Sequence, residues 1–98
     1  MENAERDFNI NTIAQTFKAN ADRAYGLYAP WVEETVASGV RCVREIEFLL
    51  DHILDFCFDQ RMVELFRMLC RYYYDIDQRA TAQYVHAYRE LWDEQSSK

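Results

Sequence analysis

Hydrophobic residues between positions 30 and 58 recur at the spacing of one side of an α-helix. Each follows the last by three or four residues, at a mean of about 3.6: Val32, Val36, Val40, Val43, Ile46, Leu50, Ile53 and Cys57. Pro30 suits the first position of a helix, and Glu33 and Glu34 follow where the helix dipole favours negative charge. The pattern predicts one long central helix over residues 30 to 58.

Gly39 is the weak point of this predicted helix, because glycine costs about 1 kcal/mol relative to alanine inside a helix. In one alternative Ser38 caps a separate helix, which places Arg41 and Arg44 near a helix N-terminus that disfavours positive charge. The apolar phase continues through Gly39, and the two arginines cost nothing in mid-helix. We therefore expect a continuous helix, with a break at Gly39 as the alternative.

A shorter helix is expected before residue 30. Asn9 is a good N-cap residue, and Phe8 before it is placed to pack on Ile13. Gly26 weakens the end of this helix, and Ala29 is biased away from helical geometry by the proline that follows it. A corner is expected there.

Two further helices are expected after residue 58. Asp59 is suited to cap a helix that runs to about residue 74, and Asp75 or Asp77 to cap the last one. The whole chain is then a single all-α domain over residues 1–98, with frayed ends at 1–8 and 95–98. It is a four-helix bundle, or a five-helix bundle if Gly39 breaks the central helix.

Composition supports this fold and narrows the function. Half of the 98 residues are hydrophobic, and two glycines and one proline are too few for a turn-rich β protein. The net charge of −6 disfavours non-specific binding to nucleic acid or anionic membrane. No apolar run is long enough to span a bilayer, and no signal peptide is recognised. The odd cysteine count (Cys42, Cys57 and Cys70) favours reduced thiols and a cytoplasmic protein.

Four acidic residues recur every four positions as a band on the predicted central helix: Glu47, Asp51, Asp55 and Asp59. One interpretation is an ordinary solvated face. The other is a docking surface for a basic protein, whose binding would weaken as salt rises. Under the second interpretation Glu47, Asp51 and Asp55 attract the partner.

The aromatic residues are too many for all of them to be buried in so small a domain. Trp31, Tyr72 and Tyr74 are candidate anchors of an interface, since tyrosine and tryptophan dominate binding energies. The competing interpretation is that they line the core with their polar tips at the surface. An apolar stripe longer than its bundle also favours a homodimer.

Other chemistries have weaker signals. Arg61, Arg67 and Arg71 could contact nucleic acid beside the tyrosines at 72–74. His52 or Cys42 could serve a metal or a thiol reaction, but the Glu-x-x-His pairs of carboxylate-bridged metal bundles are missing. No catalytic residue, metal ligand or cofactor is predicted.

The sequence thus favours a non-enzymatic, acidic, helical interaction module, an adaptor or a small inhibitor that docks on a basic site of a protein partner. In size and charge alone it is similar to small acidic inhibitors of phage or mobile-element origin, anti-CRISPR proteins among them. A helical regulator that contacts nucleic acid through its arginine and tyrosine residues is the alternative.

Overall fold

The computed structural model describes residues 10–93, which form helices and no strand. The helices are α2 (Ile10–Ser38), α3 (Val43–Leu54), α4 (Gln60–Tyr74) and α5 (Gln78–Tyr88), followed by a π-helical turn, η1 (Arg89–Asp93). The predicted all-α fold with four main helices is confirmed. The frayed ends predicted at 1–8 and 95–98, the Asn9 cap and the packing of Phe8 lie outside the described residues.

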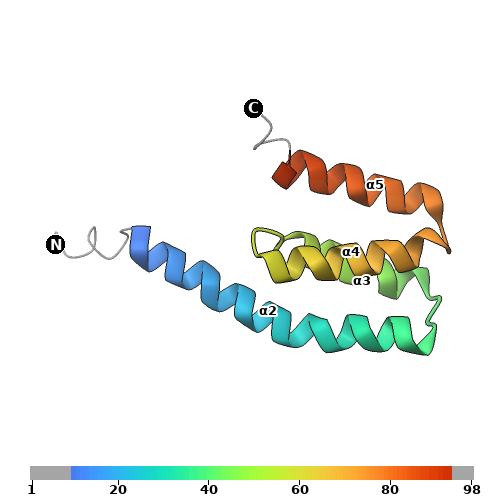
Figure 1. Ribbon diagram of the computed structural model, residues 1–98, viewed down its shortest axis with the longest axis horizontal. Helices are drawn as coiled ribbons and strands as arrows, with labels where there is room; N and C mark the ends of the chain where they lie inside the picture. The colour runs from blue at the N-terminus through green and yellow to red at the C-terminus, as the bar shows by residue number, and fades with distance from the viewer. Residues whose placement is uncertain (1–9, 94–98) are drawn as a thin grey trace.

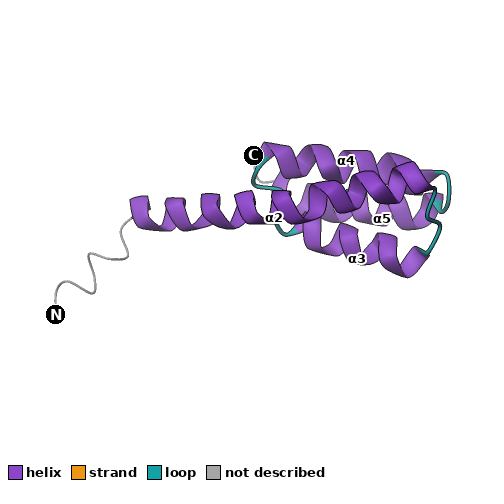
Figure 2. Ribbon diagram, turned by 90° about the horizontal axis from the view of Figure 1, so that it is seen from below, coloured by secondary structure: helices purple, strands orange, loops and turns teal. Residues whose placement is uncertain are grey.

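Successive helices run antiparallel, and α4 lies at the centre of the bundle (Figure 1). It packs against α2, α3 and α5. The first turns of α2 extend well beyond the other helices (Figure 2). This gives a molecule of 54 × 32 × 19 Å with a radius of gyration of 16.1 Å, against about 13 Å for a compact domain of this length.

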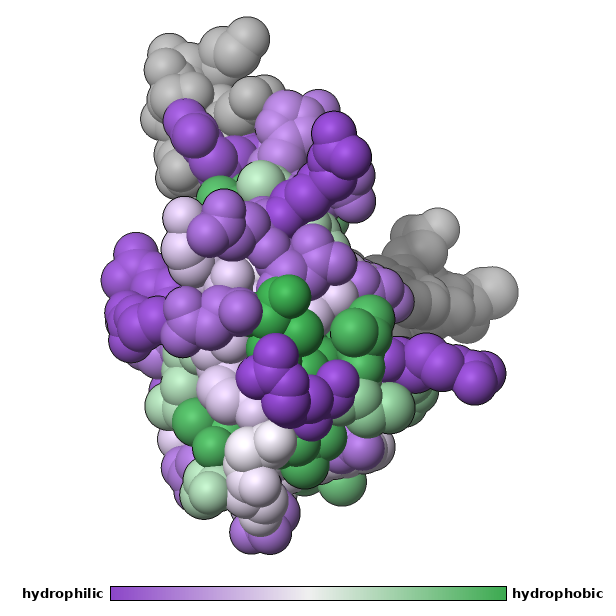
Figure 3. Space-filling model, turned by 90° about the vertical axis from the view of Figure 1, so that its right-hand side faces the viewer, coloured by the Kyte–Doolittle hydropathy of each residue, from purple (hydrophilic) through white to green (hydrophobic). Residues whose placement is uncertain are grey.

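The core lies between α4 and the helices around it. Eight hydrophobic side chains with no exposed surface form its centre: Val32, Ile46, Leu49, Leu50, Ile53, Met62, Leu69 and Tyr73. At three- and four-residue spacing they occupy one face of each helix. At the end with the α2–α3 and α4–α5 connections, hydrophobic side chains gather in the middle of the face among hydrophilic ones (Figure 3).

Two of the predicted helix caps are confirmed. Asp59 precedes α4, and its side chain accepts a hydrogen bond from the backbone N–H of Arg61 at 2.8 Å. Asp77 precedes α5 and accepts from the N–H of Ala80 at 2.9 Å. Each aspartate satisfies a backbone donor that the first helical turn leaves without a partner.

The predicted continuous helix over residues 30–58 is wrong, because the chain turns at Gly39. Gly39 has φ of +70°, a left-handed conformation that glycine adopts without strain. Its N–H donates to Val36 O at 3.3 Å, and the N–H of Val40 donates to Thr35 O at 3.1 Å. These two bonds form the Schellman motif that ends a helix. The alternative cap is also absent, since Ser38 ends α2 and its hydroxyl donates to Glu34.

The predicted corner at Ala29–Pro30 is wrong as well, since α2 continues through both residues. Proline lacks the N–H that would bond the carbonyl of residue 26, and its ring crowds that carbonyl. Figure 1 shows α2 bending part-way along its length, so the expected corner is a bend within a 29-residue helix.

Candidate interaction surface

An aromatic patch lies where α2 packs beside α3. We define it as Trp31, Phe48 and His52, which lie around the largely buried ring of Tyr28. The ring centroids of Trp31 and Phe48 are 5.6 Å apart, and those of Phe48 and His52 are 4.1 Å apart. Tyr28 lies 6.2 Å from Trp31 and 6.1 Å from His52. The rings support one another, and Phe48 remains 44% exposed.

Carboxylates border the aromatic patch because they share its helical stripe. Glu45, Phe48, His52 and Asp55 follow one another on α3 at three- and four-residue spacing, which places them on one face. Trp31 Nε1 donates to Glu45 Oε2 at 3.1 Å, which joins α2 to α3. An aromatic surface beside carboxylates favours a cation, since ring faces attract positive charge.

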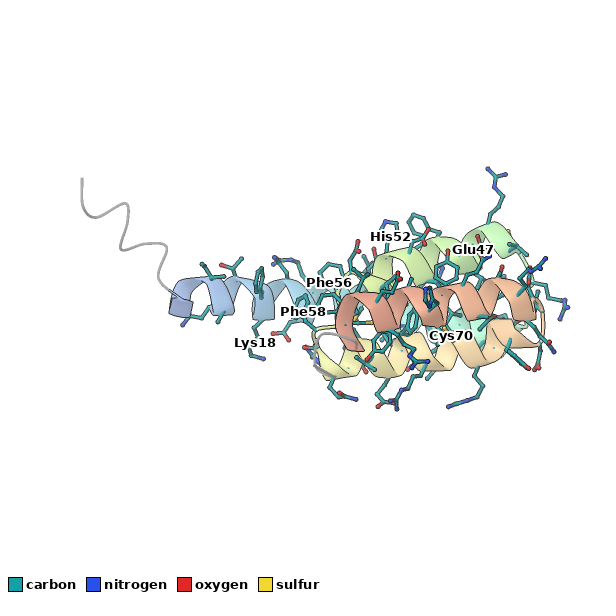
Figure 4. The ribbon with its side chains drawn as sticks, turned by 90° about the horizontal axis from the view of Figure 1, so that it is seen from above. Lys18, Glu47, His52, Phe56, Phe58 and Cys70 are labelled. Carbon is teal, nitrogen blue, oxygen red and sulfur yellow. The ribbon has the colours of Figure 1, made fainter. Side chains whose placement is uncertain are left out.

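The orientation of His52 is fixed by its own helix. Its Nδ1 lies 2.8 Å from the backbone oxygen of Phe48, so Nδ1 carries the proton that this bond requires. Figure 4 shows His52 and Glu47 on the same helix, α3. His52 is therefore part of an aromatic stack on the surface of the bundle.

The predicted acidic band does not act as one surface. The hydroxyl of Tyr73 donates to Glu47 Oε2 at 2.6 Å, and that of Tyr84 donates to Asp51 Oδ1 at 2.8 Å. Burial, and then the neighbouring carboxylate, raise the pKa of each tyrosine above its usual range. Glu47 and Asp51 therefore connect α3 to α4 and α5.

The other two acids of the band differ from one another. The side chain of Asp55 is exposed at the end of α3 and pairs with no residue that the structure describes. Asp59 caps α4, and its hydrogen bonds with Arg61 hold its pKa below the usual value. Asp55 is thus the member of the band whose carboxylate is open to a partner.

The predicted aromatic anchors are dispersed. The Tyr72 hydroxyl donates to Val40 O at 2.6 Å and so ties α4 to the α2–α3 connection. Tyr74 is exposed beside α5, where it lines a surface hollow with Val85. Only Trp31 lies among the acids of α3.

Of the arginines predicted for nucleic acid, Arg61 is separated from the other two. Arg61 pairs with Asp22 and Asp59, and its guanidinium lies 4.9 Å from the ring centroid of Tyr25. Arg67 and Arg71 instead line a groove of about 330 Å³ between α4 and α5. Arg89 and five mostly apolar side chains complete its lining: Val63, Phe66, Cys70, Val85 and Tyr88.

Two of the three cysteines are shielded from solvent by the core. Cys57 and Cys70 are buried, and burial is the main cause that raises the pKa of each thiol to about 12. Cys42 is exposed, and all three cysteines are free thiols. Between residues 10 and 93, no group of three or more potential metal ligands comes together.

Sequence reasoning missed Phe48 and His52 as members of the surface. Their spacing with Glu45 and Asp55 was a readable signal, since the four share one helical face. The approach of Trp31 was not readable, because it depends on the turn at Gly39 that folds α3 back along α2.

Comparison of the chain with protein-family models, with curated proteins and with solved structures found no match. No helix within the described residues is both long enough and apolar enough to cross a membrane. The surface chemistry of this chain is therefore the guide to its function.

Proposed function

We propose that the protein is a non-enzymatic interaction module, an adaptor or a small inhibitor, that docks on a basic site of a protein partner. The supporting observation is the aromatic patch of Trp31, Phe48 and His52 with carboxylates at its border. An arginine or lysine of the partner laid across Phe48 gains the attraction of the ring face, and a second basic side chain about 10 Å further along α3 can pair with Asp55.

The remaining acids support binding through their field. The net charge is −6. Long-range electrostatic attraction speeds the encounter with a basic partner more than it strengthens the final contact. Glu47 and Asp51 contribute to this field while they hold Tyr73 and Tyr84. Replacing them would disturb the bundle, so they are poor choices for a binding test.

The test is capture of the partner by the tagged full-length chain and by three variants. Asp55→Lys and Phe48→Ala each change an exposed side chain of the surface, and both should weaken binding at least about tenfold. Asp75→Lys makes the same charge change at an exposed position at the opposite end of the bundle, and it should bind like wild type. Binding should also weaken as salt rises. Equal loss for Asp55→Lys and Asp75→Lys would reduce the interaction to net charge and refute this docking surface.

We also propose that the protein is a homodimer and is cytoplasmic. Dimerisation is supported by the first turns of α2, which leave the bundle with exposed apolar side chains, Ile13 and Phe17. The cytoplasmic location is supported by three cysteines that are all free thiols. Sedimentation equilibrium on the purified chain measures the dimer directly, and a monomer at all concentrations contradicts it.

A further inference from the structure

A seven-residue repeat runs along α2. Its positions alternate by four and three residues: Ile13, Phe17, Asn20, Ala24 and Leu27. This is the spacing by which two helices pair along a seam. The three large apolar members, Ile13, Phe17 and Leu27, are 40%, 55% and 59% exposed, whereas Ala24 is buried against the bundle. The large side chains of the seam are therefore open to a partner helix.

The first half of the seam lies on the part of α2 that precedes its buried contact with the bundle. From Ala21 onward α2 buries residues such as Tyr28 and Val32 against the bundle, whereas every residue from 13 to 19 is exposed. The only described ring beside Phe17 is that of Phe58, with centroids 5.7 Å apart. Phe58 is itself 45% exposed, so this pair leaves a large aromatic surface open to solvent.

The same helix carries both a projecting side chain and a hollow to receive one. The hollow measures about 410 Å³ and is lined by Ala24, Leu27 and Phe56, together with Asn20, Arg23 and Tyr28. Figure 4 shows Phe56 and Phe58 where α2 leaves the bundle. Phe17 lies seven residues before Ala24, about 10 Å along the helix at 1.5 Å per residue. A two-fold axis midway between them superimposes Phe17 of each copy on the hollow of the other.

We propose that two copies of this chain pair antiparallel along α2, with the two-fold axis beside Asn20. Phe17 then fills the hollow at the partner's Ala24, and Ile13 meets the partner's Leu27. This arrangement rests on the homodimer proposed above and specifies its geometry. The uncovered half of each α2 lies over the half that is anchored in the other bundle.

The charges of the segment agree with this pairing. Lys18 and Asp22 lie on the far side of α2 from the seam, where Asp22 pairs with Lys18 and Arg61. Figure 4 shows Lys18 pointing away from the helix. In a parallel pair Phe17 would face Phe17, and both hollows would remain empty.

Disulfide trapping distinguishes the two directions. The background carries Cys42→Ser, since Cys42 is exposed while burial of Cys57 and Cys70 protects their thiols. With Asn20→Cys, two cysteines face each other at the axis within disulfide reach. With Ile13→Cys, two cysteines stand about 21 Å apart along antiparallel helices, at 1.5 Å per residue. We expect Asn20→Cys to cross-link with itself. Ile13→Cys should cross-link only when it is mixed with Leu27→Cys.

One result would overturn the antiparallel direction of the pair, and another would overturn the dimer itself. Cross-linking of Ile13→Cys as fast as Asn20→Cys would establish a parallel pair and overturn the geometry while keeping the dimer. A monomer in sedimentation equilibrium of the unmodified chain would overturn the dimer itself. As a matched pair, Phe17→Glu should raise the dissociation constant at least about tenfold, and Gln15→Glu, on the opposite side of α2, should leave it unchanged. Equal effects of these two variants would exclude the Phe17 contact.

Discussion

Single hydroxyl groups hold the acids of α3 in place. Tyr73 is fully buried, and its hydroxyl donates to the Glu47 carboxylate at 2.6 Å. Replacing Tyr73 with Phe removes this bond to a charged acceptor, so the free energy of unfolding should fall by about 1 to 2 kcal/mol. Tyr74→Phe removes the same atom from an exposed ring and should change it by less than about 0.5 kcal/mol. Urea denaturation of both variants provides the measurement, and equal effects would mean that the buried bond contributes nothing.

At the scale of residues, the sequence predicted local roles well and distant ones poorly. The capping role of Asp59 depends on residues within one turn of it, and the structure confirms that role. Tyr73 follows Leu69 by four residues, so helical spacing alone indicates an inward position, and Tyr73 is fully buried. Its bond to Glu47 depends on how α3 lies against α4, and no local pattern specifies that. The same limit hid the contact of Trp31 with Phe48.

At the scale of elements, the two glycines of the chain should respond to alanine in opposite directions. Gly39 has φ of +70°, where a Cβ is strained, so Gly39→Ala should lower the free energy of unfolding by about 1 kcal/mol or more. Gly26 lies inside α2, and a Cβ added there meets nothing within 4 Å. Gly26→Ala should therefore raise the free energy of unfolding by about 0.5 to 1 kcal/mol, through higher helix propensity. Thermal and urea denaturation measure both, and stabilisation by Gly39→Ala would contradict the Schellman turn.

The wrongly predicted helix over residues 30–58 shows that the spacing of hydrophobic residues alone cannot locate a helix break. Val36 and Val40 lie on opposite sides of Gly39, yet their spacing of four residues is that of one helix face. The phase persists because both sides of the turn bury residues against the same core. The left-handed conformation of Gly39 ends the helix. The glycine itself was therefore the better indication of a helix end in the sequence. Pro30 was given too much weight as a helix start, since α2 bends and continues through it.

At the scale of the whole molecule, the protein combines a well-packed bundle with a helix that leaves it. A helical segment whose side chains are all exposed is marginal in water, so residues 13–19 should open far more often than the core of α4. Hydrogen exchange of their amides measures this opening. A dimer that covers the segment makes its protection depend on protein concentration.

Exchange in this segment should slow at least about tenfold when the protein concentration rises from below to above the dissociation constant of the dimer. The α4 amides between Met62 and Leu69 lie in the core of the monomer and are the reference. In Phe17→Glu the segment should exchange at the dilute rate at every concentration, because the side chain that fills the partner's hollow is replaced by a charge. Exchange of residues 13–19 that is independent of concentration in the wild-type chain would mean that α2 projects without a second copy, and would leave the acidic and aromatic surface of α3 as the interaction site of a monomer.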